Sequence, residues 1–249
     1  MANSLALIVF AMLVQNTLAQ PWNGYDDFTQ GIDTNRWTSY NGLLQNPTDG
    51  LTMSSGAPNG VVDVGLNFNF SLPANQAWEI TLRSSFAAGY TPASGGLLET
   101  FVGVSSDATW SASTSSYYAN SHQRNSSGYA IVPNWILNQG PNGTTFESPS
   151  TITSRETLLR LSYNGANQLT ASYALPGTPQ NFILANTQDT SLWTDLNNDF
   201  YLAIGFYSVD TSSSTGDVTI QSVDIVPEPS SISLLAFGLA GLLAIRRRS

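Results

Sequence analysis

The sequence predicts an all-β protein folded as an antiparallel β-sandwich or barrel. Seven runs alternate apolar and polar residues or are rich in β-branched and aromatic residues, and clusters of Asn, Gly, Pro and Ser separate them. Outside the two termini, no long stretch keeps a helical period. Short strands at this spacing are typical of a sandwich or barrel. The expected strands are Val61–Phe70, Trp78–Phe86, Leu97–Val104, Thr157–Tyr163, Gln168–Leu175, Phe200–Val209 and Asp217–Val226.

The connections between these strands differ in how clearly the sequence defines them. The clearest hairpin is LLRLSYNGANQLTASYAL, whose turn Asn164–Asn167 contains an Asn-Gly pair that tolerates positive φ. Asp189–Asn197 predicts one short helical turn. The segment Thr109–Pro149 is poor in strand signals and rich in Ser, Tyr, Asn and Gly, which predicts long loops at one end or over one face of the sandwich.

Composition limits the classes of function. The chain has 249 residues, no cysteine, no lysine and a net charge of -9. Residues 20–226 are enough for one domain with its own core. The lack of cysteine excludes disulfides and a thiol nucleophile. An acidic surface repels phosphate backbones, so nucleic acid is not expected as a partner.

The N-terminus predicts a secretory signal peptide at residues 1–19, in the form of a short apolar helix. Leu5–Val14 has the length of a signal-peptide core and is too short to span a bilayer. Small residues before the junction of Ala19 and Gln20 provide a cleavage site. The first four residues carry no Lys or Arg, which departs from the usual pattern. We therefore expect an exported protein that begins at Gln20.

The C-terminus predicts a single membrane-spanning helix at Pro229–Ile245. As a helix, these 17 residues extend over about 25 Å, slightly less than the hydrocarbon core. The following arginines can snorkel to the interface and should stay on the cytoplasmic side. The alternative is a plain single-pass anchor. The basic cluster consists of Arg246, Arg247 and Arg248.

The last 24 residues resemble a PEP-CTERM sorting signal. Val226–Pro229, a short apolar helix with Gly238 and Gly241, and a terminal arginine cluster follow in the order of that family. The resemblance implies recognition by an exosortase-type membrane protease in bacteria that make exopolysaccharide. It also implies transient anchoring in the inner membrane, followed by processing and transfer to the cell surface or matrix. The processing motif would consist of Pro227, Glu228 and Pro229, within a sorting signal spanning 227–249.

Two stretches of the central domain resemble the concanavalin A-like lectin/glucanase superfamily. They are YDDFTQGIDTNRWTSY (Tyr25–Tyr40) and FYLAIGFYSVDTSSSTGDVTIQSVDI (Phe200–Ile225). The resemblance implies a jelly roll in which a first strand returns to pair near the last. Four of its residues are expected only to fill the core: Phe28, Trp37, Phe206 and Ile220.

The sequence predicts no catalytic constellation, so we expect a protein without enzymatic activity. Glucanases of the superfamily carry an acid and a nucleophile on one strand face, and the pattern Glu-x-Asp-x-Glu is absent. Glu79 and Glu99 each stand alone on their strands, which leaves open a pair assembled from separate strands. His122 with Arg124 and nearby tyrosines could act as the base of a polysaccharide lyase, but a lone exposed histidine on a polar loop is more often a bystander.

The aromatic residues of the loop-rich segment form the candidate ligand surface. Exposed aromatic faces beside amides and a guanidinium are typical of glycan binding, although such side chains also seal the ends of sandwiches. The candidates are Trp110, Tyr117, Tyr118, His122, Arg124, Tyr129 and Trp135.

A structural calcium ion is the one cofactor that the sequence suggests. Asp195, Asn197 and Asp199 place oxygen ligands at alternate positions. However, Phe200 occupies the position of the glycine that a calcium-binding loop needs, and Phe206 that of the closing glutamate. Asp-Asn clusters are also ordinary turn formers.

The leading hypothesis is therefore an exported bacterial surface or exopolysaccharide-matrix protein that binds polysaccharide without cleaving it. The alternatives are a carbohydrate-active enzyme, either a glycoside hydrolase or a polysaccharide lyase, and a structural matrix protein without a specific ligand.

Overall fold

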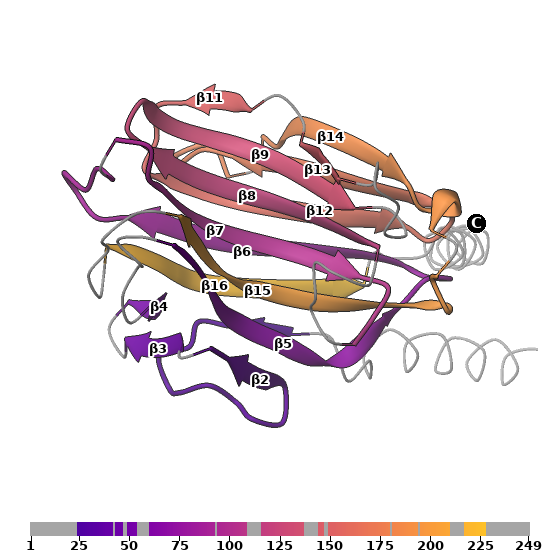
Figure 1. Ribbon diagram of the computed structural model, residues 1–249. Helices are drawn as coiled ribbons and strands as arrows, with labels where there is room; N and C mark the ends of the chain where they lie inside the picture. Colours follow the sequence, from indigo (N-terminus) through magenta and orange to yellow (C-terminus); the bar gives the residue numbers. More distant parts are fainter. Residues whose placement is uncertain are drawn as a thin grey trace, which may run out of the picture.

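The protein is a sandwich of two antiparallel β-sheets packed face to face (Figure 1). The computed structural model describes residues 24–41, 43–46, 49–53, 60–92, 94–108, 116–136, 144–146, 149–179, 181–193, 195–209 and 217–227. The side chains of 43–46, 134–136 and 144–146 are outside this description. Each sheet has eight strands within the described ranges.

We call the sheet that contains the last strand sheet A. Strand β1 pairs with β16, and the other seven strands follow one another in the order β14-β13-β12-β6-β16-β4-β3. Because the first strand pairs with the last, as the resemblance implied, the two ends of the domain lie side by side. The strands are β14 (Ile183–Asp189), β13 (Gln168–Ala174), β12 (Glu156–Asn164), β6 (Ala77–Phe86), β16 (Val218–Pro227), β4 (Gly50–Met53), β3 (Leu43–Asn46) and β1 (Gly24–Asp26).

Sheet B forms the opposite layer. Its order is β10-β9-β8-β7-β15-β5-β2, and β11 pairs with β9. Every pairing is antiparallel. The strands are β10 (Thr144–Phe146), β9 (Gly128–Ile136), β8 (Tyr117–Asn125), β7 (Leu97–Ser105), β15 (Asp199–Val209), β5 (Val61–Pro73), β2 (Trp37–Tyr40) and β11 (Ser150–Ile152).

The core lies between the sheets and is rich in aromatic contacts. Trp78 of β6 packs on Tyr163 of β12 with ring centroids 5.5 Å apart. Trp37 packs between Phe28 and Phe68, at 5.9 and 4.9 Å. Edge-to-face and tilted pairs of this kind stabilise a fold beyond their buried area. The four expected core residues are confirmed, since none is more than 1% exposed: Phe28, Trp37, Phe206 and Ile220.

The predicted hairpin and the predicted helical turn are both confirmed. Strands β12 and β13 pair antiparallel with Tyr163 opposite Leu169, and Gly165 in their turn has φ of 75°. The Asn164 side-chain oxygen accepts hydrogen bonds from the backbone N–H groups of residues 166, 167 and 168, at 3.0 to 3.1 Å. The helical turn is a single 3-10 turn at Thr190–Leu192.

The expectation of long loops over 109–149 is wrong for much of that segment. It contains β8, β9 and β10, and β8 pairs with both β7 and β9 along its whole length. The first six residues of β8 are all buried, so buried and exposed residues do not alternate along this part of the strand. Polar residues buried on both faces of a strand remove the period-2 signal on which the prediction depended.

The two terminal segments lie outside the described residues. These are the signal helix at 1–19 with its cleavage site at Ala19 and Gln20, and the membrane helix at 229–245. Within the ranges that the structure covers, no helix has the length and apolar character needed to cross a membrane.

Candidate ligand-binding face

The outer face of sheet B has a floor of small residues. Leu202, Ile204 and Phe206 of β15 point into the core, so the alternate residues Ala203 and Gly205 face away from sheet A. Gly205 lies directly opposite Gly65 of β5, and Ala203 opposite Gly103 of β7. All four are buried, because the Phe101 ring of β7 lies over Gly205 and the Tyr40 hydroxyl of β2 lies over Gly65. The small residues therefore make room for these two aromatic side chains.

A row of polar side chains crosses this floor. Asp63, Tyr207, Glu99 and Gln123 lie directly opposite one another on β5, β15, β7 and β8, so all four project from the same face. The Gln123 amide Nε2 donates to Glu99 Oε2 at 2.7 Å. The Tyr40 hydroxyl of β2 donates to Asp63 Oδ1 at 3.3 Å. We call these five residues the polar row.

The two carboxyl groups of the polar row bind protons more tightly than usual. Burial raises the pKa of Glu99 to about 7, the hydrogen bond from Gln123 opposes this rise, and the charge of Asp63 adds to it. Burial also raises the pKa of Asp63, and the Tyr40 hydrogen bond opposes that shift. Near neutral pH, Glu99 therefore exchanges between its acid and carboxylate forms, which suits it to donate or accept a hydrogen bond.

The phenol groups of the polar row stay protonated. Burial and then the charge of Asp63 raise the pKa of Tyr40. Burial, followed by the charges of Glu99 and Asp63, raises the pKa of Tyr207. Two neutral hydroxyl donors, two carboxyl groups and an amide form the hydrogen-bonding set that polyhydroxylated ligands use, and the tyrosine rings add apolar faces.

The spacing of the carboxyl groups follows from the strand order. Asp63 and Glu99 are separated by the whole of β15, which is about 10 Å between backbones at two inter-strand spacings. A retaining glycosidase needs its two carboxyl groups about 5 Å apart, whereas an inverting one uses about 6.5–9.5 Å. Two carboxyl groups from separate strands thus share this face at a wide backbone separation.

The predicted ligand surface is divided between the two faces of sheet B. Tyr117 lies on the outer face, because its register partner Ser105 alternates with the core residue Val104. Tyr118 is fully buried in the core, where its hydroxyl donates to Asn186 Oδ1 at 3.0 Å. Trp110 is outside the described residues. For Trp135, only the backbone is described, paired with that of Tyr118.

His122 lies between the sheets, so the expectation of an exposed loop histidine is wrong. It is 0% exposed, its Nδ1 is 3.3 Å from Ser84 Oγ of β6, and its ring centroid is 4.9 Å from that of Phe86. Burial lowers the pKa of His122 to about 3, and the backbone of Ser154 only partly opposes this. A neutral imidazole enclosed in the core cannot serve as the base of a lyase.

Arg124 and Tyr129 also belong to the inner side of the sandwich. The guanidinium of Arg124 stacks on the Tyr129 ring at 4.6 Å. Its Nε donates to the Tyr90 carbonyl at 3.3 Å and its Nη2 to Thr91 Oγ1 at 2.9 Å. These contacts fix the turn after β6 against the β8–β9 hairpin, so both residues have a structural role here.

The three calcium candidates do not form a common centre. Asp195 accepts hydrogen bonds from Ser106 Oγ (2.7 Å), Ser116 N (2.8 Å) and Ser116 Oγ (2.7 Å). Asp199 accepts one from Ser71 Oγ at 2.9 Å, and Asn197 is exposed. Among the residues described, no three Asp, Glu or His side chains are grouped as a metal site. Asp195 instead joins the end of β7 to the start of β8.

Replacing Asp195 with alanine is expected to lower the free energy of unfolding by about 2 to 4 kcal/mol. Burial alone would raise the pKa of Asp195, but the hydrogen bonds from Ser106 and Ser116 outweigh it and lower the pKa. The charged form therefore stabilises the fold. Urea unfolding followed by tryptophan fluorescence measures the change. Asn197→Ala, at an exposed neighbour, should change stability by less than about 0.5 kcal/mol; equal effects of the two variants would contradict this role.

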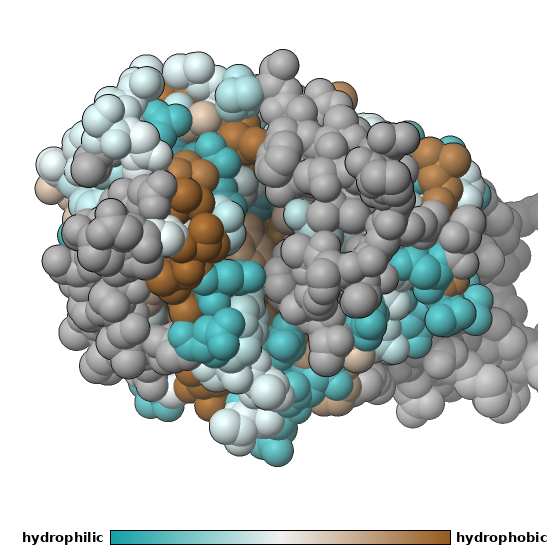
Figure 2. Space-filling view, viewed as in Figure 1, coloured by the Kyte–Doolittle hydropathy of each residue, from teal (hydrophilic) through white to brown (hydrophobic). Residues whose placement is uncertain are grey.

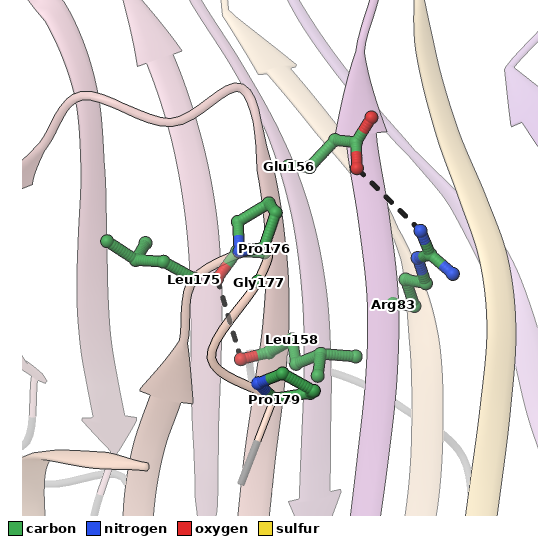
Figure 3. Close-up of a pocket in the computed structure, with 8 residues that line it drawn as sticks. Arg83, Glu156, Leu158, Leu175, Pro176, Gly177 and Pro179 are labelled. Carbon is green, nitrogen blue, oxygen red and sulfur yellow. Dashed lines mark hydrogen bonds and ion pairs between the residues drawn. The ribbon is translucent and has the colours of Figure 1, made fainter. Parts of the chain in front are cut away.

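A small pocket lies on the outer face of sheet A, away from the polar row (Figure 3). Leu158 of β12 and the prolines Pro176 and Pro179 after β13 line its apolar part. Arg83 Nη2 and Glu156 Oε2 form an ion pair at its rim, 3.7 Å apart, with the arginine side chain 54% exposed. An exposed pair at this distance contributes little to stability.

Hydrophobic and hydrophilic residues are interleaved on the described part of the molecular surface seen in Figure 2. Large apolar side chains are exposed mainly on sheet A and next to it. Ile183 and Leu184 of the edge strand β14 are 48% and 64% exposed.

Residues 226–248, of which the first two belong to β16, match the family model described as the PEP-CTERM protein-sorting motif. The chain carries a PEP-CTERM sorting motif. This motif indicates an exported protein that an exosortase recognises, as the resemblance implied. A comparison with curated proteins finds no match.

Solved structures of concanavalin A-like glucanases and lectins share the sandwich of this chain. A glycoside hydrolase family 16 endo-glucanase from Bacteroides ovatus is 12% identical with a TM-score of 0.54, over 82% of this chain and 99% of that one. A legume lectin-like domain from Entamoeba histolytica is 9% identical with a TM-score of 0.52, over 78% and 91%. The CBM2 module of the Lactobacillus casei BL23 phage J-1 evolved Dit is 9% identical with a TM-score of 0.52, over 81% and 93%. At these identities the similarity is one of fold.

The polar row is the feature that sequence reasoning missed. Its members come from five strands and are spread from residue 40 to residue 123, with Tyr207 far downstream. The one local signal was that Asp63 and Glu99 are acidic residues inside otherwise apolar runs. Acidic residues are depleted in strands and are rarely buried without a partner.

Proposed function

We propose that this protein is an exported polysaccharide-binding protein of the cell surface or matrix, and that it binds its ligand on the outer face of sheet B without cleaving it. The observation that carries the proposal is the polar row on the outer face of sheet B. The sorting motif supports a location outside the cell, where polysaccharide is the abundant polymer. The lectins and glucanases that share the fold support a carbohydrate ligand.

The polar row suits an extended carbohydrate chain. The Tyr207 ring lies between the two carboxyl groups as an apolar surface. Glu99 and Gln123 are hydrogen-bonded to each other, which holds both in fixed positions before a ligand arrives. Preorganisation of this kind reduces the entropy cost of binding.

Replacing Tyr207 with alanine is expected to weaken polysaccharide binding at least about tenfold, because both the ring and the hydroxyl are lost at the centre of the row. Binding of the full chain in detergent to a panel of soluble polysaccharides, measured by affinity electrophoresis, tests this. Tyr25→Ala is the matched control, since Tyr25 lies on β1 of sheet A and is 62% exposed. Equal weakening by both substitutions, or binding by neither variant nor the parent, would contradict the proposal.

A second candidate function is hydrolysis of the glycosidic bond. The observation that favours it is the raised pKa of both Glu99 and Asp63 on either side of Tyr207. An acid that keeps its proton near neutral pH can protonate a leaving group, while a carboxylate across the row activates water. Measuring reducing ends over a day of incubation separates the candidates. If the parent protein releases reducing ends and the Glu99→Gln variant does not, hydrolysis is favoured. If the parent binds polysaccharide without releasing reducing ends, the first proposal is favoured.

A further inference from the structure

The sorting motif begins inside the folded domain. It spans 226–248, and β16 runs from Val218 to Pro227, so Val226 and Pro227 belong to both. In sheet A, Val226 lies opposite Glu79 and Pro227 opposite Trp78 of β6. Trp78 is fully buried, and Glu79 Oε2 forms an ion pair with Arg160 Nη1 of the next strand at 3.1 Å. The strand that ends in the motif is therefore paired to a well-anchored neighbour.

The residues just before the motif are held on both sides. Val223 to Ile225 pair with β6 on one side and with β1 on the other. Val223 and Ile225 are also 0% exposed, as members of the core. Exposing this segment would break two ladders and bring core side chains into water, so it belongs to the most stable part of the fold.

Pro227 is a natural last residue for this ladder. It has no backbone N–H, so it cannot donate a ladder hydrogen bond, and prolines within sheets are confined to edges and strand ends. Its fixed φ also directs the residue before it into an extended conformation. The chain thus leaves the sheet at a defined residue.

We propose that the sandwich itself sets the upstream limit of processing: the membrane protease cuts C-terminal to Pro227, and the mature protein keeps the whole of β16. A protease binds its substrate as an extended strand. Here the backbone is already paired with β6 as far as Pro227, and with β1 as well from Val223 to Ile225, so few of its backbone groups are free for a protease. The cut hydrolyses one peptide bond, consuming one water and leaving a carboxylate on the mature chain and an amine on the released segment. The proposal is independent of polysaccharide binding, so each can fail without the other.

Intact mass of the protein recovered from the producing cells tests where the mature chain ends. The expected species begins at Gln20 and retains Pro227. A mature chain that ends at or before Val226 would overturn the proposal, because the protease would then have opened β16.

A second experiment does not depend on the native protease. The full chain in detergent is treated under native conditions with a protease of broad specificity, and the masses of the resulting fragments are measured. We expect the stable fragment to end at Pro227 or later. Insertion of Gly-Gly-Ser-Gly between Ile225 and Val226 should shift that end into the insertion, because the motif is then separated from the sheet.

The matched control places the same insertion between Ser126 and Ser127, in the exposed turn of the β8–β9 hairpin. It should create a cut at that turn and leave the C-terminal boundary of the stable fragment unchanged. A stable fragment of the parent protein that ends anywhere from Val218 to Val226 contradicts the proposal. The proposal also fails if the insertion before Val226 leaves the C-terminal end of the stable fragment unchanged.

Discussion

Replacing Gly65 with alanine is expected to lower the free energy of unfolding by about 3 kcal/mol and to disorganise the ligand-binding face. A Cβ at this position would overlap the Ile204 carbonyl oxygen and would lie 2.9 Å from the Gly205 Cα and 2.7 Å from the Tyr40 hydroxyl. The first two contacts are with backbone, which cannot turn aside as a long side chain can. Strands β5 and β15 would have to separate at the centre of sheet B.

Denaturant unfolding of the Gly65→Ala variant measures the loss, and polysaccharide binding at a temperature where the variant is still folded measures the effect on the site. Asn67→Ala is the matched control, since residue 67 lies two positions along the same face of β5 and opposite Ala203. The control should change stability by less than about 1 kcal/mol. A Gly65→Ala variant as stable as the parent would show that the two strands are not held as closely as described.

Two buried groups are expected to give opposite dependences of stability on pH, each about 3 kcal/mol between pH 7.5 and 4.5. Burial lowers the pKa of His122 from 6.5 to about 3. Below pH 6.5 the unfolded chain therefore gains a proton on this residue that the folded chain does not, so acidification destabilises the fold. Burial raises the pKa of Glu99 from 4.5 to about 7. Below pH 7 the folded chain is the first to bind a proton there, so acidification stabilises the fold.

In the parent protein these two contributions largely cancel between pH 6.5 and 4.5, and single substitutions should separate them. His122→Gln removes the destabilising group, so this variant should become more stable on acidification relative to the parent. Glu99→Gln removes the stabilising group and should become less stable. The free energy of unfolding at several pH values, from urea titrations, gives both slopes. Slopes that match the parent in both variants would mean that neither group is buried as described.

The candidate site depends on strand register, which the sequence does not display. Asp63 and Glu99 were visible as isolated acidic residues, but that they share a face with Tyr207 follows only from the pairing of β5, β15 and β7. A shift of one residue in any of these pairings would turn the row toward the core. The positions of Tyr117 and Tyr118 likewise follow from register, since neighbours in a strand point to opposite faces.

The sequence by itself determined the fold class, the β12–β13 hairpin, the core aromatics and the sorting motif. Each of these depends on local information: alternation along a strand, an Asn-Gly turn, bulky apolar residues or a linear motif that a protease reads in order. Only the tertiary structure decided that His122 is buried and that β8 is a strand, because β8 is covered on both faces and its polar residues find partners inside the sandwich. The tertiary structure also assembled the polar row and ended β16 at Pro227, since both depend on which strands lie side by side.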